Sequence, residues 1–468
     1  MSPSSLSSPL PSSLPPTPPR WRFHPGSRAG LARARAKSLP AWRLRNGRTG
    51  GRTVCAVAAW LICSAAQAIT PLALPQGEHI VQGDISIVRD GADMRIVQNG
   101  AQGIVDWRSF DIGRDAMVHV RQSSSQATLL NRVVGATTSD IAGSLEANGR
   151  LYLVNPNGIT ISSGGSISAA AFVASTLDLA NGDFLAGLPR FTASAPLAAC
   201  AIGHAGRIMV EDGGFVALLG HRIAQSGAIL APQGRVGLGA GASAMLTPHG
   251  RTLLSMRPAV GRAGGGEAAI VMSGIIEADG GLVQMSAPFG AVTGAAPGEA
   301  VNLGGVVRAH ALAGRPGSIS VTGDGGIVRL SGVLNASGNA PGSGYLAGGA
   351  VQVNGRQVLM DGGEIDVSGA MGGGSVQLAA RAADGAGSAP APGAGARDLL
   401  LFVGATSRLN ANATWHGPGG DVKLASDGKA VFLGSAQARG AALAAGPASA
   451  AASGSTPSAS ASASAASR

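Results

Sequence analysis

The chain has 468 residues, which is enough for more than one compact domain or for one long repetitive domain. Glycine is abundant at 73 residues, whereas aromatic residues make up 3% and charged residues 13%. This composition excludes a helix-rich protein, because glycine disfavours helix interiors, and the 45% hydrophobic content excludes a highly charged disordered chain. It favours many short strands joined by tight turns.

The net charge of +10 is concentrated in one segment. Residues 1–68 contain ten basic residues and no acidic residue, so the rest of the chain is formally neutral. The charge therefore does not predict a nucleic-acid partner. Cys55 and Cys63 lie in the same segment, which leaves Cys200 without an intramolecular disulfide partner in the body of the chain.

The N-terminal segment has the features of an export signal. A basic region precedes an apolar run, Val54–Ala66, that is too short to span a bilayer. The run ends in Ala66-Gln67-Ala68, an A-x-A cleavage pattern. We therefore predict that residues 1–68 are a long basic leader plus signal peptide, which the general secretion machinery delivers to the periplasm and which is cleaved after Ala68.

A strand–turn–strand pattern lies at the centre of the most informative stretch, residues 131–179. Apolar Leu151–Val154 and β-branched Ile159–Ile161 suit strands. Between them, Pro156 fixes φ near the value that the second position of a type I turn requires. The Asn155 side chain can bond its own backbone from the first position, and Gly158 suits the fourth.

Several further motifs flank this turn in a fixed order. They are Trp107-Arg108-Ser109-Phe110-Asp111-Ile112-Gly113, Asn131-Arg132-Val133, Ile141-Ala142-Gly143-Ser144-Leu145, Ala147-Asn148-Gly149 and Ala174-Ser175-Thr176-Leu177. Together with the turn, this set resembles the haemagglutination-activity, or secretion, domain at the N-terminus of filamentous haemagglutinin-like two-partner secretion exoproteins. We assign Trp107 and Phe110 to the core or to a cap of the first coil, rather than to ligand binding.

The resemblance implies both a partner and a set of site residues. In this family an outer-membrane barrel transporter with periplasmic polypeptide-binding domains captures the secretion domain, and the chain then reaches the cell surface or the medium. We expect the domain at residues 69–180. The residues that match the family's secretion motif are Asn131, Arg132, Asn155, Pro156, Asn157 and Gly158. They could equally well only shape the fold.

Residues 181–440 contain an internal repeat, Gly-Gly-x-Val-x-(Leu/Met/Val). Its copies begin at Gly213, Gly280, Gly325, Gly348, Gly373 and Gly419. The separations are close to multiples of about 22 residues, a period typical of solenoids. Such a unit holds three short strands whose apolar side chains are hidden only when units stack. We predict a right-handed parallel β-helix of about 17 coils, with 181–440 as its repeat region.

Two segments are biased toward Ala, Gly, Ser and Pro. Residues 382–396 are expected to form a loop that leaves the coil, and residues 441–468 a disordered tail. We find no catalytic set, no cofactor-binding motif, no metal-ligand spacing among the eight histidines and no nucleic-acid-binding pattern.

The interpretation that best fits is an exported exoprotein, with an adhesin as the expected type and a host glycan or protein as its receptor. A second hypothesis is the secretion portion of a haemolysin or contact-dependent toxin, which would require a distinct C-terminal effector domain. A third is a β-helical polysaccharide-acting enzyme, which would require several acidic residues on one face. The sparse acidic residues disfavour an enzyme.

Overall fold

The computed structural model describes the chain in segments. These are residues 69–193, 200–250, 252–258, 267–289, 297–312, 314–338, 346–382, 398–441 and 463–465. All described residues belong to the second of the two units into which the chain divides, Ala65–Arg468. No helix among them is both long and apolar enough to cross a membrane.

Three predictions concern residues that lie wholly or largely outside the described segments. The leader at 1–68, with the cleavage residues Ala66 and Ala68, lies outside the described residues. So does nearly all of the expected loop at 382–396 and most of the expected tail at 441–468.

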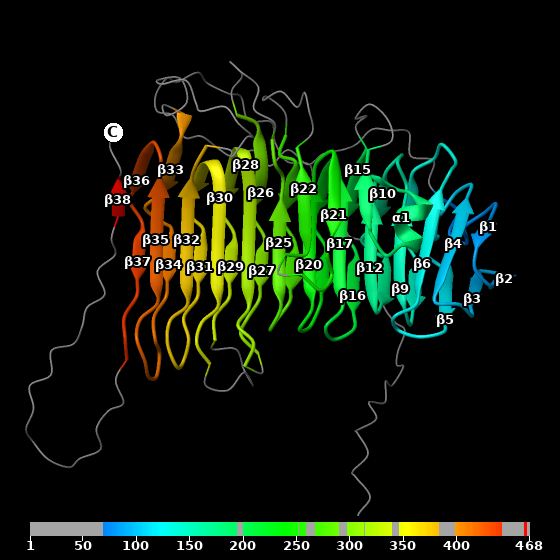
Figure 1. The fold of residues 1–468 in the computed structure, drawn as a ribbon, viewed down its shortest axis with the longest axis horizontal. Helices are drawn as coiled ribbons and strands as arrows, with labels where there is room; N and C mark the ends of the chain where they lie inside the picture. Colours follow the sequence, from blue (N-terminus) through cyan, green and yellow to red (C-terminus); the bar gives the residue numbers. More distant parts are fainter. Residues whose placement is uncertain are drawn as a thin grey trace, which may run out of the picture. The chain divides into compact units, whose positions relative to one another are not determined.

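The second unit is a parallel β-helix, which confirms the predicted fold class. Each coil crosses three faces in turn, and each strand pairs with the strands before and after it on the same face (Figure 1). In one coil, β9 (Arg150–Val154) lies on the first face, β10 (Ile159–Ile161) on the second and β11 (Ser166–Ala169) on the third. The next coil begins with β12 (Ala171–Ser175), which pairs parallel with β9.

The faces comprise the following strands. The first face has β1 (His79–Gln82), β4 (Gln102–Trp107), β6 (Thr128–Val133), β9, β12, β17 (Phe215–Gly220), β20 (Arg235–Ala240), β25 (Leu282–Ser286), β32 (Ser375–Ala380), β35 (Asp421–Ser426) and β38 (Ala463–Ala465). The second has β7 (Ser139–Ile141), β10, β15 (Ala201–His204), β18 (Arg222–Gln225), β23 (Ile270–Met272), β26 (Glu299–Leu303), β33 (Leu400–Val403) and β36 (Lys429–Phe432). Two long strands, β28 (Ser318–Leu330) and β30 (Ala350–Met360), run from the first face onto the second. The third has β2 (Ile85–Asp90), β3 (Asp93–Gln98), β5 (Met117–Gln122), β8 (Ser144–Ala147), β11, β16 (Arg207–Val210), β19 (Ala228–Leu230), β24 (Ile275–Glu277), β27 (Val306–Arg308), β29 (Val333–Asn335), β31 (Glu364–Asp366), β34 (Arg408–Asn410) and β37 (Ser435–Gln437).

The main core fills the interior of the coils. Alternate residues of each strand point inward, as in β30, where Val351 and Val353 are buried and Gln352 is exposed. Because register is preserved from coil to coil, inward residues stack in columns: Val351 pairs with Val376, which pairs with Val422. The predicted core residues Trp107 and Phe110 are buried here and meet edge to face, with ring centroids 5.5 Å apart.

One corner of the coil is built on glycine. A glycine immediately precedes most third-face strands, and its carbonyl accepts a hydrogen bond from the next coil, as Gly206 O does from Ala228 N at 2.9 Å. A Cβ on Gly227 would lie 2.2 Å from Gly206 O, so a side chain would force the coils apart. The members of this column are Gly143, Gly165, Gly206, Gly227, Gly274, Gly305, Gly332, Gly363 and Gly434, with Ser407 in one coil.

The repeat predicted from Gly-Gly pairs is only partly the structural repeat. Five copies precede first-face strands, but the copy at Gly325 precedes Ile327–Leu330 of β28, which pairs with β26 on the second face. The segment from Gly373 to Gly419 is one coil, because β32 pairs directly with β35. Insertions lengthen the coils. In the described part of the chain the third face has 13 strands, two of which, β2 and β3, form an antiparallel pair, so there are fewer coils than the 17 or so predicted.

Two of these insertions form an outer layer. It consists of β13 (Asp178–Leu179), α1 (Asn181–Leu185), β14 (Arg190–Thr192), β21 (Ser243–Leu246) and β22 (Leu254–Arg257), and its strands form an antiparallel sheet. The layer covers the outward side of the first face and encloses a second core. Residues of this core include Leu130, Tyr152, Val173, Phe184, Phe191 and Leu219.

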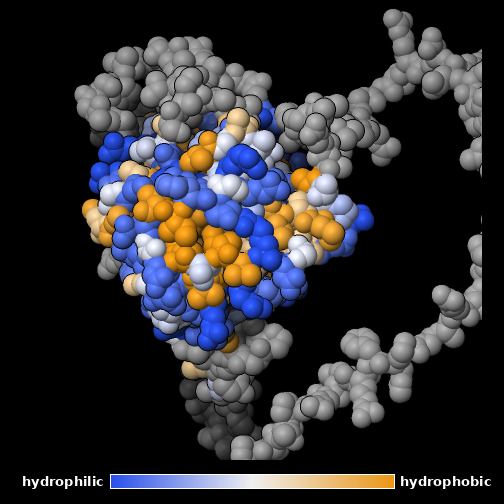
Figure 2. Space-filling model, turned by 90° about the vertical axis from the view of Figure 1, so that its right-hand side faces the viewer, coloured by the Kyte–Doolittle hydropathy of each residue, from blue (hydrophilic) through white to orange (hydrophobic). Residues whose placement is uncertain are grey.

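The N-terminal end of the stack is closed by antiparallel pairs: β1 with β4, and β2 with β3. Figure 2 looks onto this end and shows apolar residues gathered on it. Leu72, Ile80 and Val88 are exposed large hydrophobic residues of this region. The reversal of strand direction separates this end from the uniformly parallel coils that follow.

At the other end, the structure differs from the predicted disordered tail at one point. Ala463–Ala465 form β38, which pairs parallel with β35. The last strand of a stack leaves unpaired backbone groups at its edge, and a small-residue segment can bond to them regardless of its side chains.

We predict that Gly227→Ala lowers the stability of the β-helix by about 2 kcal/mol, because the methyl group would collide with a backbone oxygen that cannot move away. Gly203→Ala is the control, since its nearest neighbour would be a side-chain atom at 3.9 Å. Chemical denaturation of both variants measures the difference. Equal midpoints would contradict the role assigned to the glycine column.

A buried histidine lies in the stacked interior. His204 is 1% exposed, neither ring nitrogen has a hydrogen-bond partner among the residues that the structure describes, and burial lowers its pKa to about 4. It stacks in register on Gln225, which stacks on Met272 and then Leu303.

Folding should therefore weaken in acid. The unfolded chain binds this proton with a pKa near 6.5 and the folded chain only near 4, so stability falls as the pH drops from 6.5 to 4. The loss attributable to His204 is about 3 kcal/mol. His204→Leu should remove this part of the pH dependence, whereas His119→Leu, at a half-exposed site, should not. Denaturation midpoints between pH 4 and 7 test this, and identical profiles for wild type and His204→Leu would contradict it.

Candidate functional site

The predicted turn at residues 155–158 forms a corner of the β-helix. Gly158 N donates to Asn155 O at 3.1 Å, and Asn157 N donates to Asn155 Oδ1 at 2.9 Å. Pro156 lies at the position where its fixed φ suits the turn. The corner carries the chain from β9 on the first face to β10 on the second, so the two flanking strands pair with other coils rather than with each other.

Asn155 connects this corner to the coil beneath it. Its side chain is fully buried, and Nδ2 donates to Thr137 O at 3.0 Å and to Ser139 Oγ at 2.9 Å. Its backbone N–H donates to Ser175 O, at the same corner one coil further on. One asparagine therefore links three successive coils, and each of its side-chain polar atoms has a partner.

Asn157 and Gly158 complete the corner. Asn157 Nδ2 donates to Gly135 O at 2.8 Å, which ties the turn to the loop before β7. Gly158 has φ +123°, a conformation that residues with side chains rarely adopt. The identities at 155, 157 and 158 thus each satisfy a separate geometric requirement.

Asn131 lies inside the β-helix. It is 2% exposed, and its Oδ1 accepts a hydrogen bond from Trp107 Nε1 at 3.0 Å. Asn131 pairs with Val105 of β4 and Leu153 of β9, so the contact with Trp107 joins adjacent coils near the N-terminal end. A buried indole N–H requires such an acceptor.

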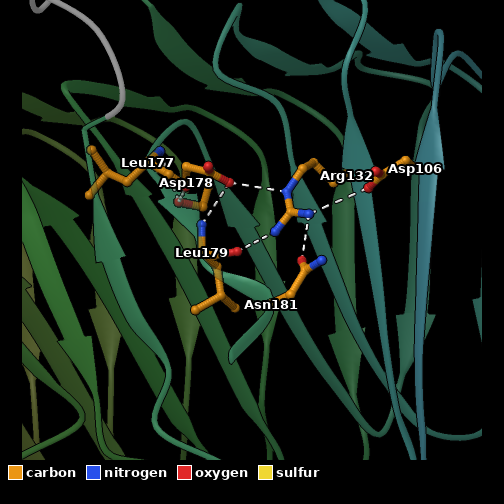
Figure 3. Close-up of polar contacts among 7 residues, drawn as sticks. Asp106, Arg132, Leu177, Asp178, Leu179 and Asn181 are labelled. Atoms are coloured by element: carbon orange, nitrogen blue, oxygen red, sulfur yellow. Dashed lines mark hydrogen bonds and ion pairs between the residues drawn. The ribbon is translucent and has the colours of Figure 1, made fainter. Parts of the chain in front are cut away.

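Arg132, the next residue, points to the opposite side of the first face and holds the outer layer (Figure 3). Its guanidinium contacts Asp178 Oδ1 at 3.1 Å, Asn181 Oδ1 at 2.7 Å and Asp106 Oδ1 at 3.4 Å, and it also donates to Leu179 O. The side chain is only 14% exposed. Arginine suits this position because its several donors lie in one rigid plane.

The last of the predicted motifs, Ala174-Ser175-Thr176-Leu177, lies where the chain passes from the first face into the outer layer. Ser175 Oγ donates to Leu177 O at 2.7 Å and accepts from Leu177 N at 3.0 Å, forming a side-chain turn where the chain leaves the first face. Asp178 and Asn181 follow directly and meet Arg132.

The structure places all six predicted motif residues in two adjacent coils, since Arg132 pairs with Val154, which precedes Asn155. It does not gather their side chains into one cleft. Asn131 faces the inner core, Arg132 faces the outer layer and the residues 155–158 form a corner. Each connects elements that are distant in sequence.

Sequence reasoning missed the partners of these residues. Asp106, Asp178, Asn181 and Ser139 hold the motif side chains, and Tyr152 packs between the rings of Phe184 and Phe191. Burial raises the pKa of Tyr152 to about 12. The available signal was a pair of polar residues, Asp178 and Asn181, shortly after an apolar strand.

The part of the chain that contains these residues is similar to known proteins. Residues 73–288 match the family model of the TPS secretion domain. A heme/hemopexin-binding protein of Haemophilus influenzae strain Rd is 42% identical over 106 residues, and a second protein of that description from Haemophilus influenzae is 44% identical over 119 residues. The aligned segments make up 23% and 25% of this chain but only 12% and 13% of the relatives.

Among solved structures, the crystal structure of the HMW1 secretion domain from Haemophilus influenzae is similar in fold. It has a TM-score of 0.61 and 24% sequence identity, and the match covers 77% of this chain and 99% of that chain.

We expect Arg132→Gln to loosen the outer layer without unfolding the coils, because it removes the ion pairs to Asp106 and Asp178. Amide hydrogen exchange should accelerate severalfold across Asp178–Thr192 and remain unchanged in β32 and β35. Arg222→Gln is the matched control, since its ion pair with Glu267 is more exposed. Unchanged exchange in the layer of the Arg132 variant would contradict this role.

Proposed function

We propose, from the premise that residues 73–288 form a TPS secretion domain, that this chain is the exported protein of a two-partner secretion system. The match of that domain is the observation that carries the proposal. The alignments cover only a small part of the relatives' length. The activity and the receptor of this chain are therefore proposed here.

The proposed route begins with the general secretion machinery, which delivers the chain to the periplasm after removal of residues 1–68 at Ala68. An outer-membrane transporter with periplasmic polypeptide-binding domains then recognises the secretion domain, with strand addition as the expected mode of contact. The chain reaches the cell surface or the medium and folds there. A stack in which each coil pairs with its sequence neighbours suits such stepwise folding.

We propose that the exported protein is an adhesin whose receptor is a host glycan or protein, rather than an enzyme. The stacked faces offer a long regular surface, which suits recognition of an extended partner. The secretion portion of a haemolysin or contact-dependent toxin remains the second candidate.

We propose that Asn131, Arg132 and Asn155–Gly158 contribute to recognition by the transporter through the contacts they make between coils and with the outer layer. The turn at 155–158 and the Arg132 contacts organise the same two coils. A transporter could therefore distinguish this domain through the local geometry that these residues create.

Export of the chain with its transporter tests the role of the turn. Asn155→Ala and Asn157→Ala should each lower the amount in the culture medium by roughly tenfold, the effect of losing about 1.4 kcal/mol of recognition. Asn412→Ala is the matched control, because Asn412 bonds Gln437 and Arg439 at a later corner.

Gly227→Ala serves as a second control for stability alone. If it reduces export as much as the turn variants do, the turn acts only through folding. Undiminished release of the Asn155 and Asn157 variants would rule out a secretion role for the turn.

A further inference from the structure

A groove separates the outer layer from part of the first face. Its volume is about 500 Å³, within the range of small-molecule sites. One wall is formed by residues around the starts of β4, β6 and β9, including Gln102, Thr128 and Arg150. The other is formed by α1, β21 and the turns of the layer, including Phe184, Leu188 and Met245. None of its lining residues belongs to the secretion motif.

The lining is largely apolar. Tyr152, Phe184 and Leu246 are buried beneath it and belong to the second core. Leu188 and Met245 also line it, yet they are 55% and 41% exposed. Apolar side chains exposed together in a concavity favour an apolar ligand.

The charged side chain of the groove is Arg150. Among the described residues that line it there is no aspartate or glutamate. The Arg150 guanidinium donates to Gln126 Oε1 and lies 5.9 Å from the ring centroid of Phe215, which fixes its position. A positioned guanidinium without a nearby carboxylate in the lining favours an anionic group on the ligand.

Tyr152 adds an independent observation. Its side chain lines the groove and is 6% exposed overall, and the hydrogen bond it receives from Asn131 Nδ2 is to its backbone carbonyl. Its neighbour contacts are ring contacts with Phe184 and Phe191. Although the ring is buried, the hydroxyl is not among the enclosed polar atoms that lack a partner, so it is accessible from the groove and can donate a hydrogen bond to an acceptor there.

We propose that this groove is a binding site for a small amphiphilic anion, a carboxylate on an apolar body. The apolar body would lie against Phe184, Leu188 and Met245, and the carboxylate would accept hydrogen bonds from Arg150 and Tyr152. The chemistry fits both an acyl chain acid and an aromatic acid, and binding assays with both distinguish these sources. The site is independent of the export route.

Titration calorimetry on the folded full chain tests the proposal with three probes: dodecanoate below its micelle concentration, 1-naphthoate, and dodecylamine as the charge control. We expect one of the two carboxylates to bind with 1:1 stoichiometry and dodecylamine not to bind. Whichever carboxylate binds identifies the apolar body as acyl or aromatic.

Variants then locate the site. Arg150→Gln and Tyr152→Phe should each weaken carboxylate binding by about tenfold, the effect of one lost hydrogen bond to a charged group. Leu188→Ser and Met245→Ser should weaken it as well, and both change exposed side chains that the fold does not need. Met371→Ser is the matched control, because Met371 is 42% exposed and lies outside the groove.

Absence of binding by both carboxylates would overturn the proposal. Equal binding of dodecylamine would overturn it too, since it would indicate general apolar adhesion. Binding that is unchanged in Leu188→Ser and Met245→Ser would place the ligand elsewhere and would have the same consequence.

Discussion

The structure depends on one constraint, the parallel hydrogen-bond ladder that holds successive coils about 4.8 Å apart. At that spacing a glycine at the corner lets two backbones approach most closely, although Ser407 occupies this position in one coil. The column that includes Gly206 and Gly227 allows this approach, since a Cβ there would lie 2.2 Å from a carbonyl oxygen. The pairing register is then the same from coil to coil, so that inward side chains stack in columns. Even His204 lies in such a column, although burial disfavours its protonated form.

A second constraint is that the first face is covered on its outward side over part of its length. There, outward residues such as Leu130 and Tyr152 are buried, and a second core forms beneath an antiparallel layer. A sheet buried on both faces loses the simple alternation of apolar and polar residues. Arg132 connects the first face to the outer layer, because it projects from β6 and binds Asp178 and Asn181 of the layer.

The secretion motif and the groove use this architecture differently. The side chains of the motif residues Asn131 and Asn155 are buried and hydrogen-bonded within the coils. A partner protein would therefore recognise the backbone geometry that they stabilise. The groove instead arises where the layer leaves the first face incompletely covered, and Tyr152 and Arg150 are presented there. An insertion that stabilises the coils can thus also create a binding surface.

Much could be predicted from the sequence because its signals are local. The corner at 155–158 follows from the preferences of Asn, Pro and Gly, and the inward positions in β30 follow from alternation. The number of coils could not be predicted from the sequence. The Gly325 copy of the repeat falls on another face, and the 46 residues from Gly373 to Gly419 are one coil with an insertion rather than two. By itself the sequence determined the three-strand coil and its turns, since these depend on residues near one another. Only the tertiary structure decided which segments are insertions, what Arg132 binds and where the groove lies, because those depend on contacts between segments whose separation along the chain has no fixed period.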